Sequence, residues 1–481
     1  MKNRLTLLRR SPRSLTLGVL ALFVLILVVG EGRTDRAPVE RQDSALFQLL
    51  SRQPVGLAHL AAIRTPGYPL LLKGTRAVCA DLSCLPEVQL LLHGLACLAL
   101  CAGLLAVGLS PAAALAASVL VTTAPLAGTF IPWVMSDLPG ASLGVLAVAA
   151  LLACLARPCG WTWSALALAL ALTWLTRPAY LFLVPLLPLA GLWHALVRDG
   201  LPAWRRTLRR TLLPLGLASC LPLLLWCTLR FALLGSFAPV SFTGFNLIGL
   251  TASWLTEPVV ARLPPEPREL AGIILAERQT RGMAPVDATT PYAQWRAQFD
   301  TNVWGLSAEA ARELGRRELA KRHQPRRVTL LREVEADHRL TGLSLALIRD
   351  QPGLYARWLR SGWHLALGRL RSAHLGSWPT RLLLLGALAL IARDLLARRR
   401  GAASAPLGER RPLLPWPSLG FLALALAYCF VSLALTLALE PPQIRYLDAA
   451  SILLPGALLA AAIEVWLHLL RPIWARFKAI G

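Results

Sequence analysis

Long apolar segments recur along the chain, separated by short polar turns and by two long polar stretches. Most of these segments are long enough to cross a hydrocarbon core of roughly 30 Å as helices. Helices are required because lipid offers no hydrogen-bond partners to an open backbone. The pattern therefore predicts an all-α polytopic membrane protein with about ten transmembrane helices, near residues 15–30, 87–108, 111–131, 138–156, 161–176, 179–197, 211–235, 380–396, 416–438 and 447–469.

Composition supports a membrane protein and changes how the charge is interpreted. Of 481 residues, 56% are hydrophobic, and the formal net charge is +24. In a soluble protein such a charge would suggest nucleic acid as a partner. Here the arginines cluster beside apolar segments, where they set orientation and meet anionic lipid headgroups. We expect membrane lipids as partners and no nucleic acid.

Arginine placement predicts the orientation of the helices. Five basic residues precede the first apolar segment, and Glu31-Gly32-Arg33 follows it in place of a small-residue cleavage site, which is typical of an uncleaved signal-anchor. With a cytoplasmic N-terminus, alternation puts three basic segments inside: 198–210, 393–411 and 471–478. Alternation and the positive-inside rule thus agree. We predict an integral protein of the bacterial inner membrane, with both termini cytoplasmic and 31–86 and 236–378 on the periplasmic or extracellular side.

The same map divides the chain into three regions. Residues 1–235 form an N-terminal transmembrane module that includes the first outer loop, 31–86. Residues 236–378 form a large outer region with amphipathic helical patterns near 306–322 and 353–370, suited to a cap or to a layer on the membrane face. Residues 379–481 form the C-terminal transmembrane helices. Cys79 and Cys84 share the first outer loop, and their spacing leaves a disulfide open.

Polar residues gather at the predicted outer ends of the helices. The first outer loop holds Asp43 and, about twenty residues later, Arg64-Thr65-Pro66-Gly67-Tyr68-Pro69. Shorter outer turns contribute Asp137, Arg177-Pro178, and the group Glu440, Arg445 and Tyr446. We expect these turns to converge on one cavity that holds a lipid-linked phosphate substrate.

Each residue also has a simpler interpretation. Arginine at a helix end, as for Arg177 and Arg445, commonly reaches to lipid headgroups. Asp137 directly precedes an apolar run and Asp43 precedes Ser44–Arg52, so either carboxylate would serve as a helix N-cap. Tyr68 and Tyr446 are also typical interfacial aromatics. The occurrence of all these residues on one predicted face favours a functional interpretation.

These motifs resemble the GT-C superfamily of membrane glycosyltransferases, in particular the protein O-mannosyltransferase and aminoarabinose transferase branch. Asp43-Ser44-Ala45-Leu46-Phe47 and the Arg64–Pro69 motif are similar to the acidic motif and the Tyr-Pro motif of that family's first outer loop. Leu175-Thr176-Arg177-Pro178, Arg445-Tyr446 and the segment 348–355 resemble three further family motifs. The likeness covers most of 15–200 and 340–460. Asp43 is followed by Ser44 in place of a second acid, which weakens the case for a metal.

The resemblance implies transfer of a sugar from a polyprenyl-phosphate donor to an acceptor hydroxyl, with inversion at the anomeric carbon. Asp43 would take the acceptor's proton, and Asp137 would assist it or hold sugar hydroxyls. Arg177 and Arg445 would bind the leaving phosphate, with Tyr446 beside them. Arg64 and Tyr68 would shape the loop and hold Asp43, or contact the phosphate. The acceptor class, whether lipid, glycan or protein, stays open. No cofactor is required, and a divalent metal is unsupported.

Two other functions remain as alternatives. An O-antigen-type polymerase or ligase is also polytopic and uses arginines for lipid pyrophosphate, but it does not need the Asp43 and Tyr-Pro arrangement. A lipid-linked sugar transporter would carry ionisable residues in the middle of the membrane. His93, His194 and Arg230 are the candidates for that role.

Overall fold

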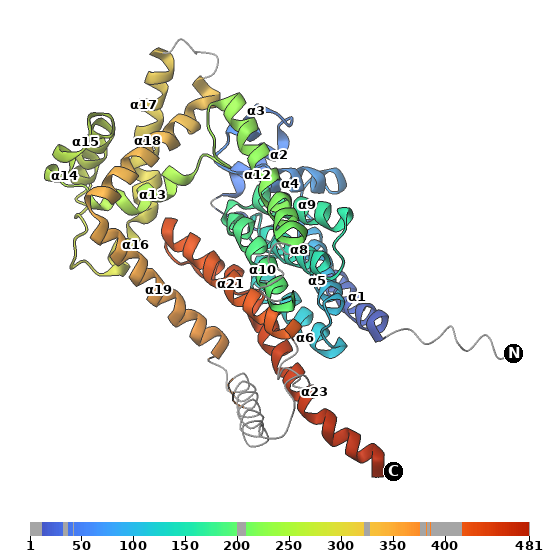
Figure 1. Ribbon diagram of the computed structural model, residues 1–481. Coiled ribbons are helices and arrows are strands. Elements are labelled where there is room, and N and C mark those ends of the chain that lie inside the picture. The colour runs from blue at the N-terminus through green and yellow to red at the C-terminus, as the bar shows by residue number, and fades with distance from the viewer. Residues whose placement is uncertain are drawn as a thin grey trace.

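The chain folds as a helical bundle that carries a second group of helices at one end (Figure 1). The computed structural model describes residues 12–31, 37–41, 43–199, 208–321, 328–375, 381, 385 and 416–480. Within these ranges the single β-type pairing is an isolated bridge between Val39 and Trp133. The all-α prediction is therefore confirmed for the described part of the chain.

Eight helices of the described residues are long and apolar enough to cross a membrane. They correspond to eight of the ten predicted segments. Of the other two, 161–176 forms α9 (Gly160–Thr176), which at 17 residues is shorter than the eight, and 380–396 lies almost wholly outside the described residues. The eight spans are Pro12–Glu31 (α1), Leu85–Ala106 (α5), Pro111–Phe130 (α6 and α7), Asp137–Ala156 (α8), Pro178–Ala195 (η2 and α10), Leu208–Leu234 (η4 and α12), Pro417–Leu439 (α21) and Ile444–His468 (α22 and α23).

Helix α8 is the central helix of the bundle. Small residues on α5 and α8 let the two backbones approach, because a side chain at Gly103 would lie 3.0 Å from Leu152. Leu100 and Leu104 of α5 are fully buried, as are Val145 and Val148 of α8. Because α8 is packed in this way, its first residue, Asp137, lies inside the protein at the end of the bundle.

Two groups of helices outside the eight spans gather at the same end of the bundle, and the last of them, Pro352–Leu375, runs from there alongside Pro417–Leu439 (Figure 1). The first belongs to loop 31–86, and the second, here called the cap, to residues 236–375. The beginning of α1 and the end of α23 lie at the opposite end. The loop helices are α2 (Ser44–Arg52), α3 (Leu57–Ala61) and α4 (Gly67–Val78); the cap helices are α13 (Thr243–Thr251), η5 (Ala252–Trp254), α14 (Glu257–Arg262), α15 (Pro265–Thr280), α16 (Tyr292–Ala297), η6 (Thr301–Ser307), α17 (Ala308–Lys321), α18 (Val328–Asp350) and α19 (Pro352–Leu375).

The cap has its own core and is fixed to the bundle by α19. Trp254, Trp295 and Trp358 are buried together in that core. Trp358 donates from Nε1 to the carbonyl of Leu437 at 2.9 Å, and the Tyr355 hydroxyl donates to the carbonyl of Ala438 at 3.0 Å. These carbonyls belong to the last turn of α21, where helix carbonyls lack partners within the helix. The bonds therefore hold the cap over the end of α21.

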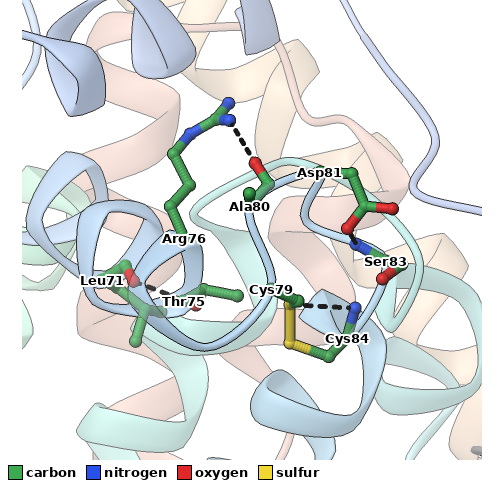
Figure 2. The surroundings of a disulfide bond; sticks show 8 residues. All are labelled: Leu71, Thr75, Arg76, Cys79, Ala80, Asp81, Ser83 and Cys84. Atoms are coloured by element: carbon green, nitrogen blue, oxygen red, sulfur yellow. Dashed lines mark hydrogen bonds between the residues drawn. A yellow bond between two sulfur atoms is a disulfide. The ribbon is translucent and has the colours of Figure 1, made fainter.

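A disulfide closes the turn between α4 and α5 (Figure 2). Cys79 and Cys84 are bonded, with Cα atoms 6.1 Å apart. In the same turn Arg76 donates to the carbonyl of Ala80 at 2.9 Å, and Asp81 accepts from the Ser83 amide at 3.0 Å. The pairing that the spacing left open is thus present, and it fits a loop exposed to an oxidising compartment.

The stability of the cap is expected to fall as pH rises from about 4 to about 7, because of Asp337. This carboxyl on α18 accepts from the Gly244 amide at 2.7 Å, and burial raises its pKa from 3.8 to about 7. The folded state then holds a proton that the unfolded state releases, so stability is lost through this interval, by up to about 4 kcal/mol. The thermal unfolding of Asp337→Asn in detergent should depend less on pH, because the amide does not ionise. Its oxygen still accepts the hydrogen bond from the Gly244 amide, so the fold should be retained. An equally steep dependence in Asp337→Asn would contradict this, and the exposed Glu309→Gln is the control.

Candidate active site

A cavity of about 430 Å³ lies between the end of the bundle and the cap. Three parts of the bundle module meet there: the first loop, the turn after α9, and the turn between α21 and α22. The cap contributes α13 and η6. The polar and aromatic residues that line the cavity are Asp43, Phe47, Arg64, Ser136, Arg177, Phe242, Thr243, Asn246, Phe299, Asp300, Trp304, Thr436, Glu440, Gln443, Arg445 and Tyr446.

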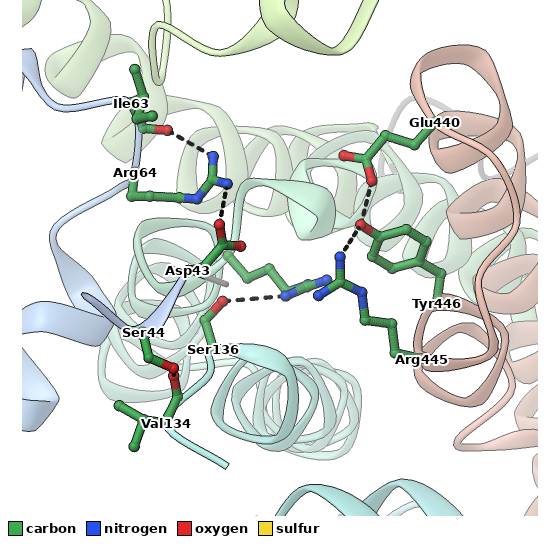
Figure 3. Close-up of polar contacts among 10 residues, drawn as sticks. Asp43, Ser44, Ile63, Arg64, Val134, Ser136, Glu440, Arg445 and Tyr446 are labelled. Carbon is green, nitrogen blue, oxygen red and sulfur yellow. Dashed lines mark hydrogen bonds and ion pairs between the residues drawn. The ribbon is translucent and has the colours of Figure 1, made fainter. Parts of the chain in front are cut away.

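Asp43 is held at the cavity by Arg64 (Figure 3). Arg64 Nη2 lies 2.8 Å from Asp43 Oδ1, while the second carboxylate oxygen has no partner among the described residues. The Arg64 guanidinium also lies over the Phe242 ring, 3.9 Å from its centre, which joins the first loop to the cap. Although α2 begins at Ser44, Asp43 makes no side-chain capping bond. The carboxylate is thus directed into the cavity.

The Pro-Gly turn explains how Arg64 reaches this position. A side chain at Gly67 would lie 2.6 Å from the backbone of Leu175 and Thr176, at the end of α9. Only glycine allows α4 to begin so close to that backbone. The turn therefore brings the first loop directly beside Arg177, which follows Thr176.

Arg177 forms a second ion pair, with Asp137. Its Nη2 lies 3.1 Å from Asp137 Oδ1, and its Nη1 donates to Ser136 Oγ at 3.2 Å. Asp137 is 1% exposed and Arg177 12%, so the pair is shielded from solvent. Arg177 has an extended backbone (φ −148°, ψ 109°), as expected of a residue before proline. Gly140 leaves room for it, since a side chain there would meet Arg177 at 2.9 Å.

The third polar group links Glu440, Tyr446 and Arg445 (Figure 3). The Tyr446 hydroxyl donates to Glu440 Oε2 and accepts from Arg445 Nη2 at 2.9 Å. Arg445 Nε is buried and has no hydrogen-bond partner among the described residues. A buried donor without a partner is costly in a folded protein and is typical of a position that binds a ligand.

The structure brings five of the seven predicted site residues to one cavity. Asp137 and Tyr68 do not line it. Asp137 pairs with Arg177 and does not reach the cavity. It is the first residue of α8, so Ser136 takes the N-cap position that was also possible for Asp137. Tyr68 is fully buried and packs edge-to-face on Phe47, with ring centres 4.9 Å apart. The residues on the cavity are Asp43, Arg64, Arg177, Arg445 and Tyr446.

Ser44 follows Asp43 in place of a second acidic residue. It is buried, and its hydroxyl donates to the carbonyl of Val134 at 2.8 Å and accepts from the Arg41 amide at 2.7 Å. Ser44 therefore fixes the loop beside the turn before α8. Within the described residues, His, Cys, Asp and Glu side chains form no group of three or more that could hold a metal ion.

A second cavity of about 770 Å³ adjoins the first. Asp43 and Arg445 line both cavities, and so does Asp300 of the cap. Arg41, Arg296, Arg369 and Asp448 also line the second cavity. Sequence reasoning missed Asp300, Asn246 and Trp304, because no motif surrounds them and only the folded cap brings them to the site.

The chemistry available at the boundary of the two cavities is a carboxylate facing several guanidinium groups. Asp43 offers an unpaired oxygen as a proton acceptor, and Arg177 and Arg445 offer donors to an anion. Searches against protein families, curated proteins and solved structures found no match to this chain.

Proposed function

We propose that this protein is a membrane glycosyltransferase that moves a sugar from a polyprenyl-phosphate donor to an acceptor hydroxyl. The observation that carries the proposal is the cavity in which the free oxygen of Asp43 faces Arg177 and Arg445 at one end of a transmembrane bundle. Four of the five sequence motifs that resemble the GT-C superfamily contribute residues to this cavity: Asp43, Arg64, Arg177, Arg445 and Tyr446.

The reaction assigns one role to each side of the cavity. Asp43 accepts the proton of the acceptor hydroxyl as its oxygen attacks the anomeric carbon. The bond between that carbon and the phosphate oxygen breaks on the opposite face, so the configuration inverts. The phosphate leaves with the electron pair, and Arg445 and Arg177 stabilise its negative charge. Tyr446 and Glu440 orient Arg445.

A lipid-linked donor is supported by the apolar surfaces that continue from the site. Leu439 and Leu435 of α21 line the cavity. One and two turns further along the same face, Val431 and Ala427 line an apolar cavity of about 420 Å³ between α10 and α21. These surfaces offer an isoprenoid chain a path from the polar site into the bundle.

Two of the three residues that suggested a transporter, His93 and Arg230, have structural partners instead. His93 hydrogen-bonds Ser142 Oγ and the carbonyl of Val121, each at 3.0 Å, inside the bundle. Arg230 donates to the carbonyl of Leu60 at 3.0 Å and to Ser241 Oγ at 2.7 Å. Both therefore have structural partners.

The proposal places the cavity on the periplasmic or extracellular side of a bacterial inner membrane, with both termini in the cytoplasm. A membrane-impermeant thiol reagent added to intact spheroplasts should then label Arg281→Cys in the cap but not Arg206→Cys, in a background with Cys159 and Cys220 replaced by serine. Labelling only at position 206 would indicate the opposite orientation in the membrane.

The proposed activity is tested by comparing envelope glycans, glycolipids and glycoproteins by mass spectrometry. Cells that lack the protein should lose one sugar residue from one of these classes and accumulate a glycosylated polyprenyl phosphate. Wild-type protein should restore the sugar, and Asp43→Asn should not. Full restoration by Asp43→Asn would contradict the role of Asp43 as general base. Unchanged glycoconjugates in cells that lack the protein would contradict the proposed activity.

A further inference from the structure

Three aromatic rings of the cap stack beside the cavity. The Phe242 and Trp304 rings are 6.2 Å apart at 27°, and the Phe245 and Trp304 rings are 5.8 Å apart at 23°. Phe245 is fully buried, whereas Phe242 and Trp304 are half-buried and line the cavity. Gly249 permits this packing, because a side chain there would meet Val303 at 2.7 Å. The stack places the Trp304 ring at the cavity.

Two polar side chains of the cap line the same cavity without partners. The amide group of Asn246 on α13 has no hydrogen-bond partner among the described residues. The carboxylate of Asp300, directly before η6, has neither a hydrogen-bond nor an ion-pair partner in the same part of the chain. Asp300 and Trp304 are four residues apart on one helical turn, and all three residues line the cavity that contains Asp43.

We propose that Asn246, Asp300 and Trp304 form the subsite that binds the transferred sugar, an inference that rests on the proposed function. A sugar ring combines an apolar face of C–H groups with hydroxyls around its edge. An aromatic ring suits the first, because it offers a large apolar surface at low cost in conformational entropy. A carboxylate accepts hydrogen bonds from hydroxyls, and an amide both accepts and donates them.

The subsite gives the cap a role in recognition that differs from that of the bundle. The bundle supplies the arginines that face phosphate, and the cap supplies the groups that face hydroxyls. Sites that hydrogen-bond hydroxyls discriminate strongly against ligands that lack them. Asn246 and Asp300 therefore select the sugar, while affinity for the lipid phosphate depends on Arg177 and Arg445.

The test separates affinity for the sugar from affinity for the lipid phosphate. Binding of undecaprenyl phosphate and of its glucosyl, mannosyl, galactosyl and arabinosyl derivatives is measured by thermophoresis on purified protein in detergent. The wild type should bind one glycosylated lipid roughly ten- to a hundredfold more tightly than undecaprenyl phosphate. Trp304→Leu and Asp300→Asn should each reduce this ratio about five- to tenfold and leave the affinity for undecaprenyl phosphate unchanged. Trp161→Leu, on a tryptophan exposed at the far end of α9, is the control.

Other outcomes overturn the inference in distinguishable ways. Equal affinity of the wild type for undecaprenyl phosphate and every glycosylated lipid would remove the sugar subsite and leave the lipid-phosphate site intact. An unchanged ratio in both cap variants, or an equal loss of affinity for all ligands, would assign these residues a structural role. Absence of binding to any polyprenyl phosphate by the wild type would remove the proposed function as well.

Discussion

Replacement of Asp43 with asparagine is expected to reduce sugar transfer about 10²–10⁴-fold, the usual contribution of a positioned general base. The amide oxygen keeps an acceptor for Arg64, whose Nη2 lies 2.8 Å from Oδ1 in the wild type, so the loop should retain its structure. Affinity for the donor should change little, because Asp43 acts on the acceptor hydroxyl in the proposed mechanism. The measurement is transfer rate and donor affinity at matched expression.

Two other carboxylates of the first outer loop provide controls for this substitution. Asp81→Asn alters an exposed residue that hydrogen-bonds Ser83, and it should leave transfer unchanged. Asp35→Asn, at a position outside the described residues, should be mild. If Asp35→Asn abolished transfer and Asp43→Asn did not, the general base would be a different carboxylate.

Replacement of Arg445 with lysine should reduce transfer or donor affinity roughly ten- to over a hundredfold. A charge-assisted contact to phosphate contributes about 1.5–3 kcal/mol, and lysine cannot reproduce the fork of the guanidinium group. The Tyr446 hydroxyl would also lose the Nη2 donor that lies 2.9 Å away. Transfer rate and affinity for undecaprenyl phosphate measure the effect.

The control for this substitution is Arg317→Lys, on an exposed residue of the cap that pairs with Glu313. It should behave as wild type. If Arg445 only reached to lipid headgroups, lysine would replace it with little effect, because any long cation suffices there. Equal activity of Arg445→Lys, Arg317→Lys and wild type would therefore contradict a contact between Arg445 and the phosphate.

The spans were predictable because lipid imposes a length and a polarity that the sequence displays directly. The boundaries of α8 and α21, for example, follow from apolar runs that end at Asp137 and Glu440. The meeting of Asp43 and Arg64 was also anticipated, since both lie in one loop and the Pro-Gly turn limits their separation. Such local constraints are visible without the fold.

The contribution of the cap could not be predicted, because it depends on packing between distant segments. Asp300 and Asn246 are polar residues in polar surroundings, and only the approach of η6 to α13 at Gly249 brings them together. Tyr68 shows the converse. Its motif left open whether it shapes the loop or contacts the phosphate, and the aromatic contact with Phe47 places it in the core between α2 and α4, where it shapes the loop.

The most direct measurement of the central claim uses purified protein in vesicles made with lipids from cells that lack it. These lipids contain the accumulated glycosylated polyprenyl phosphate and, where the acceptor is a lipid, the acceptor too; otherwise an envelope extract is added. Mass spectrometry follows the donor over time. The account predicts that wild-type protein converts the donor to polyprenyl phosphate and transfers its sugar to the acceptor, while Asp43→Asn leaves the donor intact. Equal consumption by both proteins, or none by the wild type, would contradict it.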